Sequence, residues 1–187
     1  MDNKLRRISV IGLGKLGYPL AGCFAAKGYE VIGVDLDPRT VETVNLGQSP
    51  IIESGVQDLL LKTEGRIRAV LDPRDAVLDS DITLVVVPTP SGDDGTFSNQ
   101  HVLKACEAIA GGLADKSTYH LVALVSTVMP GSPGGGIRSK LEQASGKNCG
   151  EGFGLCYVPS FVALGSVIRD FMRPDYLLIG ESDAKAG

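Results

Sequence analysis

Three glycines near the N-terminus form the pattern that most directly indicates chemistry. They are spaced Gly12-x-Gly14-x-x-Gly17 and follow the apolar run from Ile8 to Ile11. In this pattern the first glycine permits a tight turn, the second lets backbone approach a pyrophosphate, and the third lets a helix pack closely on a strand. The free N–H groups and the dipole of that helix favour phosphate. The spacing predicts a phosphate-binding turn, with an ordinary flexible turn as the alternative.

An acid at the end of a second strand makes the phosphate interpretation more specific. The stretch from Glu30 to Asp35 is typical of a strand that ends in a carboxylate. A carboxylate there accepts hydrogen bonds from the adenosine ribose hydroxyls and repels a 2′-phosphate. The order of strand, glycines, helix, strand and acid predicts a dinucleotide site that prefers NAD over NADP. Arg39 is a further candidate for contact with the adenosine, and solvation of its side chain is the alternative.

Strands and helices alternate along the rest of the sequence. Apolar runs and turn residues predict strands over residues 7–11, 30–35, 66–70, 81–87, 119–125, 153–158 and 176–180. Helical spacing predicts helices over 15–27, 38–46, 56–61, 98–111 and 132–144, and one starting at 73. The pairs Asp37-Pro38 and Asp72-Pro73 are typical helix starts. This alternation predicts an α/β fold with a doubly wound parallel sheet, that is, a Rossmann-type domain over residues 1–187.

Hydroxyl side chains and prolines follow the later strands. Thr89 lies between Pro88 and Pro90, Ser126 and Thr127 follow the fifth strand, and Ser160 follows the sixth. Ligands of doubly wound sheets bind beyond the carboxyl ends of the strands. We expect Thr89 to contact a ligand, whereas Ser126 and Ser160 fit ligand contact and helix capping equally well.

Composition excludes several classes of function. The chain has 187 residues, a net charge of −4 and no basic stripe, so we expect no nucleic-acid partner. Its four cysteines show no metal-ligand spacing, and we expect no metal site and reduced thiols. The basic segment from Lys4 to Arg7 precedes an apolar run, as in a signal peptide, but glycines and Lys15 interrupt that run. We therefore expect a cytoplasmic protein with no membrane partner.

Four segments occur in an order that resembles a known family. They are Gly12 to Ala21, Val87-Pro88-Thr89-Pro90, Ser126 to Gly131, and Tyr157-Val158-Pro159-Ser160-Phe161 with Gly165. Together with residues 48–55, they resemble the NAD-binding domain of the UDP-glucose/GDP-mannose dehydrogenase family. Members of that family use two NAD to oxidise the sugar C6 alcohol of a nucleotide sugar to a carboxylate, which gives a uronic acid.

The resemblance implies roles for individual residues. Thr89 and Thr127 would lie near the nicotinamide ribose and the catalytic water. The set expected to bind NAD(H) is Gly12, Gly14, Lys15, Leu16, Gly17, Asp35, Arg39, Pro88, Thr89, Ser126 and Thr127. The expected catalytic residues within this chain are Thr127 and Ser160.

The sequence departs from the family pattern in two respects. Ser160 stands where the family usually has a Glu, and a serine cannot be a carboxylate base at neutral pH. The family's nucleophilic Cys and its central-helix Lys and Asn have no counterpart in this chain. We therefore expect the N-terminal part of a longer dehydrogenase that is a homodimer at full length, and we expect this chain alone to be inactive. Two alternatives remain: a catalytically incomplete NAD-binding or regulatory module, and the cofactor domain of a hydroxyacid or 6-phosphogluconate-type dehydrogenase.

Overall fold

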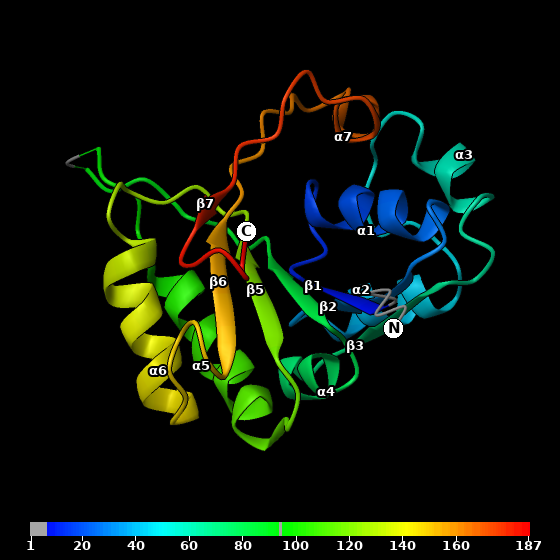
Figure 1. Cartoon of the computed structure of the whole chain (residues 1–187). Helices are drawn as coiled ribbons and strands as arrows, with labels where there is room; N and C mark the ends of the chain where they lie inside the picture. The colour runs from blue at the N-terminus through cyan, green and yellow to red at the C-terminus, as the bar shows by residue number, and fades with distance from the viewer. Residues whose placement is uncertain (1–6, 94) are drawn as a thin grey trace.

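A seven-stranded sheet forms the centre of the molecule (Figure 1). The structure is a computed structural model, which describes residues 7–93 and 95–187, so residues 4–6 of the basic segment lie outside the described residues. The strand order is β3-β2-β1-β4-β5-β6-β7, and the first six strands are parallel. The strands are β1 (Arg7–Ile11), β2 (Glu30–Val34), β3 (Ile67–Val70), β4 (Ile82–Val85), β5 (His120–Leu124), β6 (Phe153–Tyr157) and β7 (Gly180–Glu181). The predicted doubly wound α/β fold is confirmed.

Helices cover both faces of the sheet and bury two separate apolar cores. On one face α4 (Pro73–Leu78), α5 (Gln100–Asp115) and α6 (Arg138–Ser145) pack side by side (Figure 1). On the other face lie α1 (Gly17–Ala26), α2 (Pro38–Asn45), α3 (Val56–Leu60) and α7 (Val167–Met172). Successive strand residues alternate between the two cores, as side chains of a strand must. In β1, for example, Ile11 lies in the first core and Val10 in the second.

The helix starts follow the chemistry expected from their sequences. The side chain of Asp37 accepts a hydrogen bond from Arg39 N at 3.0 Å, and that of Asp72 accepts one from Arg74 N at 2.9 Å. A proline follows each cap at the first helical position, where a missing N–H costs nothing. The predicted starts of α2 and α4 are therefore confirmed.

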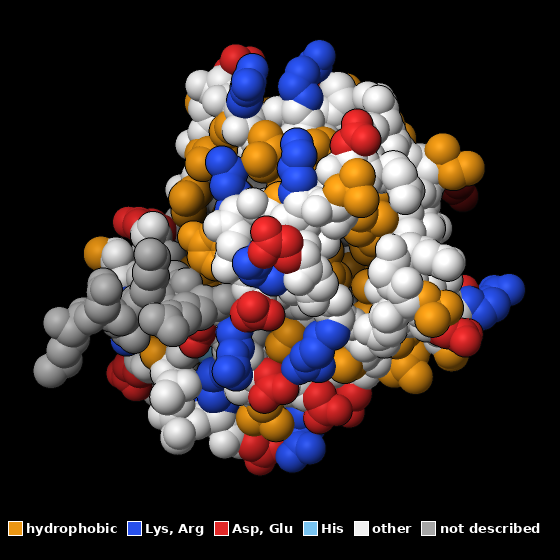
Figure 2. All heavy atoms as spheres, turned by 90° about the vertical axis from the view of Figure 1, so that its right-hand side faces the viewer, with side chains coloured by type: hydrophobic (Ala, Val, Ile, Leu, Met, Phe, Trp, Pro, Cys, Tyr) orange, Lys and Arg blue, Asp and Glu red, His pale blue; other side chains and the backbone are white. Residues whose placement is uncertain are grey.

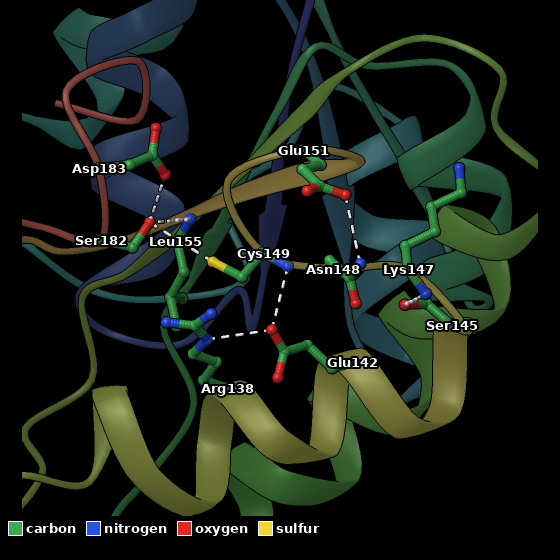
Figure 3. Close-up of polar contacts among 10 residues, drawn as sticks. All are labelled: Arg138, Glu142, Ser145, Lys147, Asn148, Cys149, Glu151, Leu155, Ser182 and Asp183. Atoms are coloured by element: carbon green, nitrogen blue, oxygen red, sulfur yellow. Dashed lines mark hydrogen bonds and ion pairs between the residues drawn. The ribbon is translucent and has the colours of Figure 1, made fainter.

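The seventh strand is where the prediction is wrong. Residues 176–179 form no strand and are exposed, whereas the strand occupies Gly180–Glu181 and runs antiparallel to β6. A polar cluster holds it there (Figure 3). Ser182 Oγ accepts a hydrogen bond from Leu155 N of β6 at 3.3 Å and one from Cys149 Sγ at 3.4 Å, and it donates to Asp183 at 2.8 Å. The contacts of Ser182 therefore reinforce pairing at the edge of β6, in which the preceding apolar run takes no part.

The largest differences from the predicted helix limits occur in two helices. Helix α5 begins at Gln100 and continues to Asp115, beyond the predicted end at 111. The helix predicted from 132 begins as a π-helical turn, η1 (Pro133–Ile137), before α6 starts at Arg138. Gly135 has φ −98° and ψ −111°, which is not helical, because three successive glycines favour no regular turn.

The exposed face on the right of Figure 1 mixes charges of both signs (Figure 2). Near the edge strand β3, Arg66 pairs with Glu64 at 2.6 Å and Arg68 pairs with Asp79 at 2.7 Å. Such exposed pairs stabilise little, but they interrupt any continuous basic surface. In the described part of the chain, no helix has the length and apolar character needed to span a membrane.

Candidate functional site

A cleft of about 620 Å³ opens beyond the carboxyl ends of β1, β4 and β5. It lies where the chain reverses its strand order, between β1 and β4, which is where doubly wound sheets bind ligands. Its size is typical of a small-molecule site. The cleft brings together the predicted residues Gly12, Gly14, Lys15, Leu16, Gly17, Asp35, Pro88, Thr89, Ser126, Thr127 and Ser160.

The three glycines of the turn serve different needs. Gly12 has φ +96°, and a Cβ there would collide with the carbonyl oxygen of Val86. A Cβ on Gly17 would collide with the carbonyl oxygen of Gly12. Gly14 differs, because its φ is not positive and a Cβ there would have no atom within 4 Å. The fold itself therefore requires Gly12 and Gly17, but neither packing nor backbone conformation requires a glycine at position 14.

The backbone of this turn presents free donors to the cleft. Helix α1 starts at Gly17, and its N-cap residue Leu16 provides no side-chain hydrogen bond. In the described part of the chain, the N–H groups of Gly14, Lys15 and Leu16 have no hydrogen-bond acceptor. Successive free N–H groups at the start of a helix form an anion site, which the helix dipole reinforces.

Asp35 holds the turn against the end of β2. One carboxylate oxygen accepts a hydrogen bond from Leu13 N at 2.9 Å, and the other accepts one from Asp37 N at 3.0 Å. Each oxygen retains a second lone pair, and the side chain lines the cleft. Asp35 therefore positions the turn and is also oriented to accept hydrogen bonds from ribose hydroxyls.

Arg39 is the one predicted site residue that the structure does not bring into the cleft lining. Its guanidinium donates to both carboxylate oxygens of Asp37, each at 3.2 Å. These hydrogen bonds lower the pKa of Asp37. The guanidinium is thus engaged by Asp37 at the start of α2, and its contact with the adenosine stays a prediction.

The hydroxyl groups at the rim fall into two kinds. Within the described residues, the side chains of Thr89, Thr127 and Ser160 make no hydrogen bond, so they are available to a ligand. Ser126 is buried, and its hydroxyl donates to Val87 O at 2.8 Å and accepts from Val87 N at 2.9 Å. Ser126 therefore fixes the exit of β4, the segment that carries Thr89.

Helix α5 forms a wall of the cleft that was not predicted from the sequence. Helix α5 contributes His101, Lys104, Ala105 and Ala108, which recur at helical spacing on one face. Pro73 and Leu36, a residue that is 87% exposed, also line the cleft. The signal was present in the sequence, because these residues lie beside the core stripe of α5, but nothing local shows that this face borders a cleft.

A second, apolar hollow of about 380 Å³ lies between α1 and residues 158–177, and it shares Ser160 with the cleft. Phe161 and Tyr176 contact each other in it, with their ring centres 4.9 Å apart and their planes tilted by 46°. Cys23 also lines it, and burial raises the pKa of this thiol to about 11, while burial raises that of Cys106 to about 12. Neither cysteine is therefore a ready thiolate nucleophile.

The cleft fits NAD in its donors and its shape. Gly14 leaves open space beside three free N–H groups, which suits a diphosphate. Asp35 offers acceptors for ribose hydroxyls, and the strip of Leu36, Pro73, Ala105 and Ala108 offers an apolar surface for a base. Residues of this chain could therefore hold the adenosine diphosphate half of NAD.

Comparisons with known proteins agree with this geometry. The chain is 37% identical to the GDP-mannose 6-dehydrogenase of Pseudomonas syringae pv. syringae, over 97% of this chain and 42% of the relative. It is 38% identical to the UDP-glucose 6-dehydrogenase of Haloferax volcanii, over 96% of this chain and 42% of the relative. The chain thus spans less than half the length of these relatives.

Solved structures give the same result. A ternary complex of GDP-mannose dehydrogenase from Pseudomonas aeruginosa superposes with a TM-score of 0.92 at 37% identity, over 96% of this chain and 42% of that one. A UDP-glucose dehydrogenase from Pyrobaculum islandicum superposes with a TM-score of 0.90 at 33% identity, over 97% of this chain and 42% of that one. Residues 6–187 match the model of the UDP-glucose/GDP-mannose dehydrogenase family, NAD binding domain. The chain belongs to this family, and the part of the family that it matches is the NAD-binding domain.

Proposed function

We propose that this chain binds NAD in the cleft and serves as the cofactor half of a nucleotide-sugar 6-dehydrogenase. In this proposal the whole protein oxidises the C6 alcohol of a UDP- or GDP-sugar to a uronic acid. Bound NAD supplies the hydride acceptor. The named activities of the relatives support this assignment, since both substrates occur among sequences about equally similar to this one.

The residues of the chain have separate tasks in this proposal. The N–H groups of Gly14, Lys15 and Leu16 bind the diphosphate, and Asp35 binds the adenosine ribose. Thr89 and Thr127 donate hydrogen bonds at the nicotinamide end of the cleft, where their hydroxyls are free. Pro88 and Pro90 hold the backbone around Thr89 extended, because proline fixes its own φ and restricts the residue before it.

In this proposal the full-length protein is a homodimer in the cytoplasm.

The observation that carries the proposal is the glycine at position 14. The protein has no internal need for it, because a Cβ there meets open space at a φ that any residue adopts. Its lack of a side chain matters only to a partner that approaches this backbone closely, as a pyrophosphate does.

The test is to replace Gly14→Val and to follow fold and binding separately. We expect circular dichroism and the melting temperature of the free chain to stay close to wild type. We expect the thermal stabilisation by NADH to disappear, because the new side chain occupies the phosphate position. Gly17→Val is the matched control, and it should lower the melting temperature itself because its Cβ collides with Gly12. Unchanged stabilisation of Gly14→Val by NADH would contradict the proposal.

Ser160 favours a second candidate, a module that binds NAD without completing the reaction. It lies where the cleft and the apolar hollow meet, and a hydroxyl there cannot act as a carboxylate base. The two candidates differ in one observable: only the dehydrogenase, as the native protein, produces NADH from UDP-glucose, GDP-mannose or UDP-N-acetyl sugars.

A further inference from the structure

Helix α5 presents one cation to the cleft that no sequence motif indicated. Lys104 lines the cleft between the positions of His101 and Ala108, and its side chain is exposed. In the described part of the chain it makes no ion pair and no hydrogen bond. The neighbouring Lys140 of α6 differs, because it pairs with Glu107 at 3.2 Å. Within the described residues, no carboxylate therefore forms an ion pair with the ammonium group of Lys104.

Lys104 and the glycine turn lie on opposite walls of the cleft. The turn leads into α1 on one face of the sheet, while α5 lies on the other face, so the cleft runs between them over the strand ends. Free N–H groups and Lys15 lie on the first side, and Lys104 lies on the second. Asp35, a carboxylate that lines this cleft, is already engaged by two backbone N–H groups.

Apart from His101, the side chains that line the cleft with Lys104 on this wall are small and apolar. Ala105 and Ala108 leave space along the wall, and Pro73 and Leu36 also line the cleft. The wall therefore offers a flat surface for a base next to one flexible ammonium group for a phosphate. A charge-assisted hydrogen bond from such a group is stronger than one between neutral partners.

We propose that Lys104 binds the diphosphate of the cofactor from the α5 side and makes this site selective for adenosine diphosphates over uncharged nucleosides. The inference rests on the proposed function, and it adds a residue that determines specificity. The anion is then held between backbone donors on one wall and a side-chain cation on the other.

The test is calorimetric titration of wild type, Lys104→Met and Lys104→Arg with NAD, ADP and adenosine at low and high salt. Methionine keeps the length and the apolar stem and removes only the charge. We expect Lys104→Met to weaken NAD and ADP about 10-fold, as for the loss of a hydrogen bond to a charged group. Adenosine affinity should stay unchanged, and Lys104→Arg should keep most of the ADP affinity. Lys140→Met is the matched control, and it should bind NAD and ADP like wild type.

The other outcomes separate the two proposals. Equal ADP affinity of wild type and Lys104→Met would overturn the role of Lys104 while leaving NAD binding intact. Equal losses for ADP and adenosine would also overturn it, because they would place Lys104 at the base. Absence of NAD binding by wild type would contradict the proposed function itself.

Discussion

Ser126 is a residue whose hydroxyl the protein already uses. The side chain is 5% exposed and bridges β5 to the exit of β4 through both backbone groups of Val87. Ser126 therefore affects a ligand indirectly, by positioning the segment after β4 that carries Thr89. Asp35 also has a structural role, because its carboxylate accepts hydrogen bonds from the backbone N–H groups of Leu13 and Asp37 in the absence of a ligand.

We predict that Ser126→Ala lowers the free energy of unfolding by about 1–3 kcal/mol, because it leaves the N–H of Val87 without an acceptor. Urea denaturation measures this change. Ser139→Ala, on the exposed side of α6, is the control and should stay within about 0.5 kcal/mol of wild type. If Ser126→Ala were as stable as this control and yet lost NAD binding, Ser126 would touch the cofactor directly.

Among the elements, those with a local cause were predictable from the sequence. The Asp-Pro pairs fix the starts of α2 and α4, and Gly28 and Gly47 follow the ends of α1 and α2 at positive φ of 93° and 71°. Apolar runs marked β1, β2, β4 and β5 because strands buried on both faces carry few polar residues. Most of the cleft followed from these elements, since the strand order places their carboxyl ends together.

Elements that depend on distant neighbours were not predictable. The apolar residues 176–179 have the sequence pattern of a strand, but pairing with β6 begins only at Gly180. Two residues later, Ser182 contacts Leu155 of β6. The wall formed by α5 was missed because helical spacing shows the core stripe of α5, but not that the adjoining face borders a cleft. The engagement of Ser126 and Asp35 depends on turn geometry, which residue types alone do not give.

At the scale of the whole molecule, a buried polar network lies at the opposite ends of the same strands. His120 is fully buried, with Nε2 at 2.8 Å from Thr83 Oγ1 and Nδ1 at 3.1 Å from Ser80 O. Because a carbonyl only accepts, Nδ1 carries the proton and Nε2 accepts from Thr83. The ammonium of Lys116 also donates to Ser80 O. This network joins β4, β5 and the end of α4 through a neutral imidazole.

Protonation of that imidazole should oppose folding. Burial, assisted by the charge of Lys116 and against the opposite effect of Asp81, lowers the pKa of His120 from 6.5 to about 3. A lowered pKa means that its stabilisation is complete above pH 6.5 and is lost as the pH falls toward 3. We predict that the free energy of unfolding falls by roughly 1 kcal/mol for each pH unit as the pH decreases from 6.5 toward 3.

Denaturation of wild type and His120→Gln between about pH 5 and 6.5 tests the prediction, because most carboxylates remain ionised in that range. The variant removes the titrating group and should show a smaller slope, even if it is less stable at every pH. Equal slopes for the two proteins would show that His120 does not titrate on unfolding.

Calorimetric titration of the chain with NAD and with NADP tests whether the cleft is an NAD site. Asp35 should place a carboxylate against the 2′-phosphate of NADP, and like charges in a cleft repel strongly. We predict saturable binding of NAD, NADP weaker by about 10-fold or more, and a smaller difference in Asp35→Ala. Equal affinity for the two cofactors, or no saturable heat with NAD, would mean that the cleft is not an NAD-selective site.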